Sequence, residues 1–166
     1  MKKQVGLFVG LIVLLGIGYG VVHAAQGQTK VPKVVAGSKA TNTSLELTAV
    51  NGQTIAVNPN EKTVLHFMTS SCGDCIGTEE SLTKFAHTAD VQIISVDAEP
   101  QVDNLSTIQA FKKATGATWD YVLLKNPALI NEFHVTELDT VVILYHGKVI
   151  YNGIAPSTST LKRVLV

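Results

Sequence analysis

The chain has 166 residues, and its 13 basic and 13 acidic side chains give a formal net charge of zero. These charges are interspersed, so the sequence lacks the basic run with which nucleic-acid-binding proteins contact phosphate groups. Its length fits one domain of ordinary size and an additional segment for export or attachment.

The N-terminal residues have the pattern of an export segment. Lys2 and Lys3 precede residues 5–22, a largely apolar stretch without a charged residue. We expect residues 1–24 to be either a signal peptide cleaved after Ala24 or a single transmembrane anchor, for which about 17–25 residues suffice. Both alternatives place the rest of the chain outside the cytosol, either released or held at the cell membrane.

A linker and a domain are predicted after this segment. Residues 25–43 are polar and rich in Thr, Lys, Ser and Gly, as in linkers. The domain, residues 44–166, opens with two β-prone stretches on either side of Asn51-Gly52. This pair is typical of two-residue turns, so we expect a β-hairpin there.

The short apolar run of residues 62–68 predicts a buried strand, and both cysteines of the chain, Cys72 and Cys75, follow it. Residues 75–89 predict a helix, in which Glu79 and Glu80 are interpreted as charges near the helix start. The apolar face of this helix is expected to contain four residues: Ile76, Leu82, Phe85 and Ala86.

The remaining sequence continues to alternate between strand and helix patterns. In chain order it predicts a strand at 91–98, a helix at 105–116, a short strand at 119–124, a short helix at 126–133, a hairpin at 139–154 and a closing helix at 156–166. This order indicates an α/β fold in which helices flank a central mixed sheet. Right-handed crossovers make the first two core strands parallel, and the late hairpin adds antiparallel strands.

Cys72 and Cys75 are expected where the first core strand ends and its helix begins, the rim at which open α/β sheets place their sites. Their spacing suits half of a zinc site, a soft-metal clip or a disulfide that opens and closes, but two cysteines exclude a four-cysteine zinc site. A helix N-terminus stabilises a thiolate, which makes Cys72 the expected nucleophile and Cys75 the cysteine that resolves a mixed disulfide.

The order of elements and the segment VLHFMTSSCGDC resemble the thioredoxin fold and its strand-then-CxxC entry. The preceding hairpin and the export segment are similar to membrane-anchored thiol–disulfide oxidoreductases of the TlpA and ResA type. A second resemblance is to the SCO/SenC copper-assembly family. It rests on IISVDAEPQVDNLSTIQAFKKATGATWDYVL and on LDTVVIL, which lies where that family carries an Asp-His pair.

The resemblance to thioredoxins gives roles to residues around the cysteines. His66, six residues before Cys72, takes the position of a buried acid and is a candidate proton relay, although a structural core histidine is an equal alternative. Asp74 replaces the proline between the cysteines. It is expected to raise the thiol pKa and shift the pair toward reduction, unless solvent screens its charge.

Asp139 and Thr140 occupy the place of the cis-proline segment that faces the CxxC pair in thioredoxins, and they are expected to face the substrate. Without proline, the peptide before Asp139 should be trans. The Asp139 carboxylate would then lie near the thiols, where it narrows the substrate range or admits a metal ion.

These observations predict an enzyme without a cofactor, an exported thiol–disulfide oxidoreductase that reduces cysteines of other exported proteins. Apocytochromes or copper-site assembly partners are candidate substrates, and a membrane protein is a candidate electron donor. The alternative is an SCO-like protein that binds Cu(I) through Cys72, Cys75 and His134.

Overall fold

The computed structural model describes residues 45–166. The predicted signal peptide or anchor, and all of the predicted linker, lie outside the described residues. Within residues 45–166, no helix combines the length and the apolar character that crossing a membrane requires.

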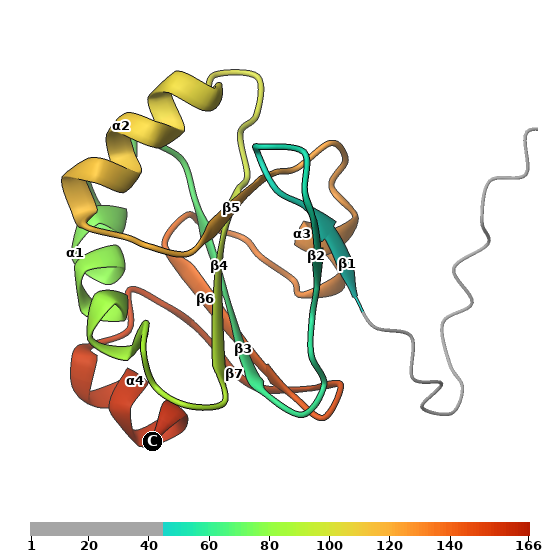
Figure 1. Cartoon of the computed structure of the whole chain (residues 1–166), viewed down its shortest axis with the longest axis vertical. Coiled ribbons are helices and arrows are strands. Elements are labelled where there is room, and N and C mark those ends of the chain that lie inside the picture. The colour runs from blue at the N-terminus through green and yellow to red at the C-terminus, as the bar shows by residue number, and fades with distance from the viewer. Residues whose placement is uncertain (1–44) are drawn as a thin grey trace, which may run out of the picture. The chain divides into compact units, whose positions relative to one another are not determined.

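The described domain is built on a five-stranded mixed sheet (Figure 1). In sheet order its strands are β5 (Asp120–Leu123), β4 (Val91–Asp97), β3 (Lys62–Met68), β6 (Thr140–Tyr145) and β7 (Lys148–Ile154). The strands β3, β4 and β5 are parallel to one another, and β6 and β7 are antiparallel to their neighbours. This topology confirms the predicted fold class.

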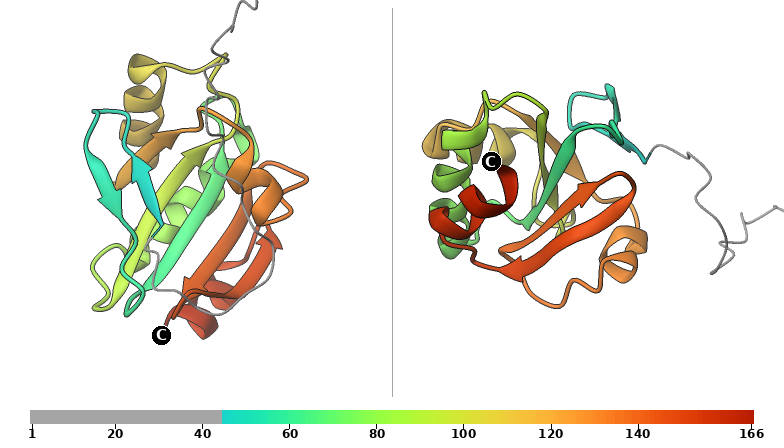
Figure 2. Two further views of the ribbon diagram at one scale, coloured as in Figure 1. Left: turned by 90° about the vertical axis from the view of Figure 1, so that its right-hand side faces the viewer. Right: turned by 90° about the horizontal axis from the view of Figure 1, so that it is seen from below.

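Helices cover both faces of the sheet, as Figures 1 and 2 show. Three of them lie on one face: α1 (Gly73–Leu82), α2 (Leu105–Thr115) and α4 (Thr158–Leu165). The opposite face carries α3 (Ala128–Glu132) and a hairpin of β1 (Glu46–Thr48) and β2 (Thr54–Ala56). The parallel order explains this division, because successive right-handed crossovers from β3 to β4 and from β4 to β5 place α1 and α2 on the same face.

Strand β3 is central because its side chains are apolar in both directions. Leu65 and Phe67 pack with the hairpin and α3, while Val64 packs with Leu82 of α1. All three are inaccessible to solvent. Burial of this size stabilises a fold by about 1.5–3 kcal/mol for each large side chain.

The N-terminal hairpin has the predicted position, but the predicted two-residue turn was wrong: the N–H of Ala49 donates to the carbonyl of Gln53 at 2.8 Å, which leaves residues 50–52 as the loop. Gly52 has a φ of 86°, a conformation that glycine adopts without strain. The hairpin also contacts the main sheet: Ala49 forms an antiparallel bridge with Val122, and the N–H of Val50 donates to the carbonyl of Tyr121 at 2.8 Å. It therefore pairs with part of the otherwise free edge of β5.

Helix α1 differs from its prediction in length and in orientation. It ends at Leu82 and continues as the short 3₁₀ segment η1 (Thr83–Phe85), so the predicted helix 75–89 was too long. The predicted apolar face was wrong only for Ile76, which is 38% exposed, because Leu82 and Phe85 are buried and Ala86 packs against them. The buried face consists of Cys75, Thr78, Glu79 and Leu82. These residues follow the i, i+3, i+4, i+7 spacing of a helix face, which here includes a carboxylate.

The other helix ends and the last turn follow the sequence signals. Asn104 caps α2 in a capping box, Gly116 ends it with a φ of 74°, and the Ser157 side chain caps α4. The β6–β7 hairpin turns at His146 and Gly147, whose φ values are 51° and 70°. Both values are positive, as in the type I′ turns of two-residue hairpins.

Candidate active site

The two cysteines lie between the end of β3 and the first turn of α1. They form a disulfide with a Cα–Cα distance of 5.4 Å. Cys72 is the N-cap of α1, and its sulfur accepts a hydrogen bond from the N–H of Cys75 at 3.2 Å. Cys72 is half-buried and Cys75 is fully buried. One sulfur is thus within reach of a partner at the surface, and the other lies behind it.

A row of polar side chains crosses the sheet beneath the cysteines. His66 on β3 is in register with Ser95 on β4, and Ser95 is in register with Tyr121 on β5. Paired residues in adjacent strands point to the same face of a sheet. All three side chains therefore face α1, and all three are buried.

Glu79 of α1 is the common partner of this row. Its Oε1 atom accepts a hydrogen bond from the Ser95 hydroxyl at 2.5 Å and lies 2.7 Å from His66 Nδ1, and its Oε2 accepts from the Tyr121 hydroxyl at 2.7 Å. Trp119 donates its indole N–H to Ser95 Oγ at 2.8 Å, which leaves the Ser95 proton for Glu79. The carboxylate is fully buried, and these donors satisfy it. Its interpretation as a helix-start charge was wrong.

His66 lies between two carboxylates. Its Nδ1 faces Glu79, and its Nε2 lies 3.0 Å from Oδ1 of Asp139. Burial by itself lowers the pKa of His66. The hydrogen bonds and negative charges of Asp139 and Glu79 outweigh burial and raise the pKa above its ordinary value. The imidazole therefore holds a proton more firmly than an exposed histidine does. The same network raises the pKa of Tyr121, through burial and then through the charge of Glu79.

Asp139 is fixed by its backbone as well as by His66. Its φ is 61°, its N–H donates to the carbonyl of Phe67 at 2.8 Å, and its carbonyl accepts from the N–H of Ala155 at 2.9 Å. No cis peptide bond occurs in residues 45–166, in agreement with the expected trans peptide. The side chain of Asp139 is buried, as is that of Thr140, whose hydroxyl donates to the carbonyl of Glu137 at 2.6 Å. The substrate-facing role of Asp139 and Thr140 stays a prediction.

Known proteins share this architecture. Over 153 residues the chain is 29% identical to sporulation thiol-disulfide oxidoreductase A of Bacillus subtilis, an alignment that covers 89% of this chain and 88% of that protein. The crystal structure of StoA from Bacillus subtilis matches with a TM-score of 0.60 and 25% identity over 75% of this chain and 98% of that one. The chain is thus similar to thioredoxin-like thiol–disulfide oxidoreductases in sequence and in fold.

Further relatives agree with this assignment of the fold. A thioredoxin-like protein from Aeropyrum pernix matches with a TM-score of 0.64 and 23% identity over 73% of this chain and 87% of that one. Mercury resistance operon ORF3 of Streptomyces lividans is 23% identical over 146 residues, or 84% of this chain and 77% of that protein. No family model matches the chain. The relatives do not show the predicted similarity to SCO/SenC proteins.

The family's chemistry needs two cysteines that open and close a disulfide, and the structure provides them. This oxidoreductase uses the Cys72–Cys75 pair. The structure does not support the ligand set of the copper alternative. In residues 45–166, the group with metal-ligand atoms within 4.8 Å of one another is His66, Cys75 and Asp139, and it does not include His134. His134 is exposed after α3, so the ligand set predicted for copper is not brought together.

Asp74 lies in the first turn of α1 with an exposed side chain. Water and salt screen an exposed carboxylate strongly. The exposure of Asp74 therefore favours the alternative in which solvent screens its charge and the thiol pKa is little affected. Its role in tuning the cysteines stays a prediction.

The carboxylate of Asp103 holds the loop that leads to Cys72. Asp103 accepts hydrogen bonds from the Thr69 hydroxyl and the Ser70 N–H, both at 2.7 Å, and from the Ser70 hydroxyl. Burial alone would raise the pKa of Asp103, but the hydrogen bonds from Ser70, Thr69 and Thr107 lower it to about 2. The loop is therefore attached to the start of α2 by an ionised carboxylate.

The pKa of Asp97, at the end of β4, is shifted upward, in the opposite direction to that of Asp103. Burial raises its pKa to about 7, the N–H of Glu99 opposes this rise, and the nearby negative charge of Asp103 adds to it. Its Oδ2 atom is buried and has no hydrogen-bond partner in the described residues. A proton on this oxygen removes the cost of burying a second carboxylate beside Asp103.

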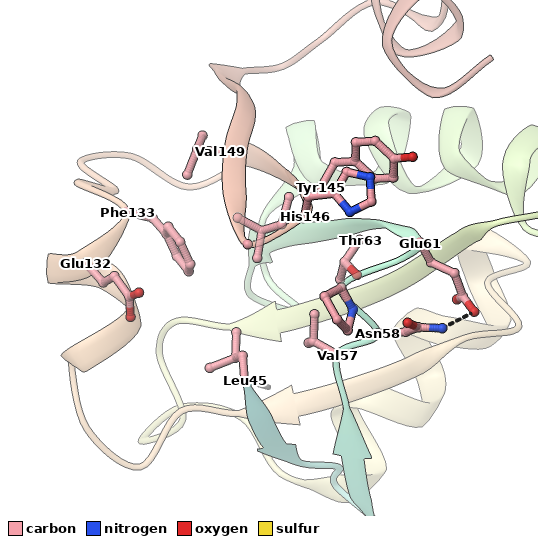
Figure 3. Close-up of a pocket in the computed structure, with 13 residues that line it drawn as sticks. Leu45, Val57, Asn58, Glu61, Thr63, Glu132, Phe133, Tyr145, His146 and Val149 are labelled. Atoms are coloured by element: carbon pink, nitrogen blue, oxygen red, sulfur yellow. Dashed lines mark hydrogen bonds between the residues drawn. The ribbon is translucent and has the colours of Figure 1, made fainter. Parts of the chain in front are cut away.

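A pocket of about 290 Å³ lies on the other face of the sheet and is lined by Val57, Phe133 and His146 among others (Figure 3). Its polar edge includes Asn58, whose amide donates to Glu61 Oε1 at 2.6 Å (Figure 3). Neither cysteine nor any member of the His66 network lines it. This pocket is therefore separate from the redox site.

Three members of the His66 network were missed from the sequence: Glu79, Ser95 and Tyr121. Glu79 had a usable signal, because it lies four residues after Cys75 and three before Leu82, on the face that both of them share. Ser95 interrupts an otherwise apolar strand, a position at which a buried polar group needs a partner. Tyr121 carried no signal beyond its strand pattern.

Proposed function

We propose that this thiol–disulfide oxidoreductase works outside the cytosol as a reductase of disulfides in other exported proteins. One observation carries the proposal: a half-buried Cys72 at the N-terminus of α1 is bonded to a fully buried Cys75. In such a pair, the outer sulfur exchanges with partners and the inner sulfur completes the exchange.

The reaction begins with the reduced pair. The Cys72 thiolate attacks one sulfur of a substrate disulfide, forms a mixed disulfide and releases the other substrate sulfur as a thiolate, which takes up a proton. Cys75 then loses its proton and attacks Cys72, which restores the intramolecular disulfide and releases the second substrate thiol. The substrate gains two electrons and two protons, and the enzyme loses the same number.

His66 is the candidate relay for the proton of Cys75. A ligand atom of His66 lies within 4.8 Å of Cys75 Sγ, in a region without exposed side chains. Glu79 holds Nδ1 and leaves Nε2 on the side of Asp139. An imidazole fixed in this way passes its Nε2 proton to Asp139 and takes up the proton of Cys75 without rotating, which suits a proton relay.

The charges around Cys75 support the reducing direction. Two buried carboxylates, Glu79 and Asp139, flank one imidazole, so the cluster is net negative even when His66 is protonated. Negative charge near a thiol disfavours its thiolate, and a less stabilised thiolate makes the pair a stronger reductant. Asp74 contributes in the same direction, weakened by its exposure.

The proposed location rests on the N-terminal sequence, which fits a membrane anchor or a signal cleaved after Ala24. Two structural matches have names that agree with it: an exposed lipoprotein thioredoxin of Streptococcus pneumoniae and a secreted disulfide oxidoreductase of Mycobacterium tuberculosis. Outside the cytosol, this reductase needs a source of electrons, and a membrane protein that reduces Cys72–Cys75 is the proposed donor. Its substrates are the disulfides of exported proteins, such as apocytochromes or copper-site assembly partners.

Trapping of mixed disulfides between the enzyme and its substrates tests this proposal. A Cys75→Ser variant cannot resolve the mixed disulfide, so it should accumulate in non-reducing gels as adducts with exported proteins, and Cys72→Ser should form none. A redox titration of the wild-type protein should give a potential near that of reducing thioredoxins, at about −270 mV. A value near −120 mV, as in strong oxidants, would contradict the reducing direction. Stoichiometric Cu(I) binding without any exchange activity would instead favour the copper-carrier alternative.

A further inference from the structure

The reduced active site has the composition of a zinc site. We infer that, once the disulfide is open, Cys75, His66 and Asp139 bind one Zn²⁺ ion. The Cys72 sulfur lies outside this group and is bonded to Cys75 in the oxidised protein, so it becomes the fourth ligand only by turning toward the ion after reduction. The inference rests on the proposed function insofar as that function supplies the reduced pair.

The first argument is the set of donor atoms. One ligand atom from each of His66, Cys75 and Asp139 lies within 4.8 Å of the other two. Zinc bonds to sulfur, nitrogen and oxygen are about 2.0–2.3 Å long, so two ligands of one ion are at most about 4.6 Å apart. In tetrahedral coordination these bond lengths place two ligands about 3.3–3.8 Å apart, so shifts of at most about 1.5 Å bring these atoms within range. A thiolate, an imidazole and a carboxylate suit Zn²⁺, whereas Cu(I) prefers sulfur and nitrogen without the carboxylate.

The second argument is the support behind the histidine. Metal-binding histidines in proteins usually donate their other ring N–H to a carboxylate, which fixes the ring and its tautomer. His66 has this arrangement, because Glu79 Oε1 lies 2.7 Å from Nδ1. Ser95 and Tyr121 in turn hold the Glu79 carboxylate. His66 Nε2 already lies 3.0 Å from Asp139 Oδ1, a separation typical of two ligands on one tetrahedral ion.

The third argument is the rigidity of the framework. The three donors come from β3, from α1 and from the residue directly before β6, and β3 pairs with β6 along five residues. All three are at most 4% exposed. Half-buried Cys72 gives an entering ion its contact with the surface. The site is thus formed before the metal arrives, which lowers the cost of ordering its ligands.

The disulfide makes this site dependent on redox state. In the oxidised protein both sulfurs are bonded to each other and offer no thiolate. An external dithiol supplies two electrons, becomes a disulfide itself and leaves two Cys thiols. Zn²⁺ then replaces the two thiol protons and the proton on His66 Nε2 that faces Asp139, and all three protons pass to solvent. A zinc-bound pair is withheld from exchange, so zinc should inhibit the reduced enzyme and protect its thiols from oxidation.

The experiment compares reduced and oxidised protein in competition for Zn²⁺ with a chromophoric chelator. We expect one Zn²⁺ per reduced chain and none per oxidised chain. His66→Gln and Asp139→Asn should each weaken binding at least about tenfold, and Glu79→Gln about 10–100-fold. His134→Asn is the matched control and should bind like the wild type. Co²⁺ in place of Zn²⁺ should show thiolate charge-transfer absorption only after reduction.

Equal binding by both redox forms would overturn the inference, as would folded Asp139→Asn and His66→Gln variants with wild-type affinity. Asp139→Asn keeps the size of the side chain, and melting of each oxidised variant shows whether it is folded. Disulfide exchange is measured on the same wild-type sample without zinc. An active enzyme that binds no zinc overturns only this inference. A chain that binds zinc but exchanges no disulfide supports it and overturns the proposed function.

Discussion

Oε1 of Glu79 lies 2.7 Å from Nδ1 of His66, and neither side chain is exposed to solvent. The first residue belongs to α1 and the second to β3, so this contact joins the helix that carries the cysteines to the centre of the sheet. Two further hydrogen bonds, from Ser95 and Tyr121, extend the junction over three strands. The following predictions start from this network and its surroundings.

Replacing Glu79 should destabilise the domain. Glu79→Gln keeps the shape of the side chain but removes the charge and places an amide among donors. Buried hydrogen bonds to charged groups contribute about 1.5–3 kcal/mol each, so we expect a loss of about 2–3 kcal/mol in the free energy of unfolding. Urea unfolding of the oxidised protein measures it. The neighbouring Glu80 is exposed, so Glu80→Gln should change stability by less than about 0.5 kcal/mol.

Asp139 should make the cysteine pair more reducing. In Asp139→Asn a negative charge near Cys75 is lost, so the reduction potential should rise by about 30 mV, which corresponds to one pKa unit in a two-electron couple. Equilibration with glutathione buffers measures the potential. Asp74→Asn should cause a smaller rise, because solvent screens its exposed carboxylate. An unchanged potential in Asp139→Asn would remove the electrostatic argument for a reductase.

His66 should accelerate the step in which Cys75 resolves the mixed disulfide. General base catalysis by a positioned group contributes about 10²–10⁴-fold, so His66→Gln should slow this step by at least about 100-fold. Rapid-quench measurement of a mixed disulfide preformed on Cys72 separates resolution from the first attack. His134→Asn serves as the control with an unchanged rate. An equal rate in His66→Gln would assign His66 a structural role only.

The free energy of unfolding should fall as the pH rises, because Asp97 loses its proton in the folded protein. Its pKa is about 7 in the folded protein, above the ordinary value of about 3.9, so the folded state binds this proton more tightly than the unfolded state. The resulting contribution is complete below about pH 4 and is lost as the pH rises through 7. It amounts to about 1.4 kcal/mol for each pKa unit, or on the order of 2–4 kcal/mol here.

Asp97→Asn isolates this effect, because the amide stays uncharged throughout. The variant should match the wild type near pH 4 and become relatively more stable up to about pH 8. Chemical unfolding of both proteins at several pH values gives the difference. A difference that stays constant between pH 4 and pH 8 would show that Asp97 does not titrate as described.

Local patterns predicted the elements well, and contacts between elements poorly. The strand at residues 62–68 was predicted with its observed bounds, because an uninterrupted apolar run has few alternatives in a folded domain. The Gly116 helix end likewise depends on local backbone chemistry.

The network around His66 depends instead on sheet register. His66 and Asp139 are 73 residues apart in the chain, and Tyr121 and Glu79 are 42 apart. Only the pairing of β3, β4 and β5 makes three polar residues adjacent, and a single sequence does not specify that pairing residue by residue. Glu79 was misplaced because a carboxylate on a helix is usually solvent-exposed, and only its partners make burial favourable.

The attachment of α1 to the sheet through Glu79 has one further consequence for turnover. None of the anchoring hydrogen bonds involves a sulfur atom. We therefore expect oxidation and reduction to leave the backbone almost unchanged, with movement limited to the cysteine side chains. A substrate protein would meet the same enzyme surface before and after electron transfer. Its release would then depend on cleavage of the mixed disulfide and not on a conformational change of the enzyme.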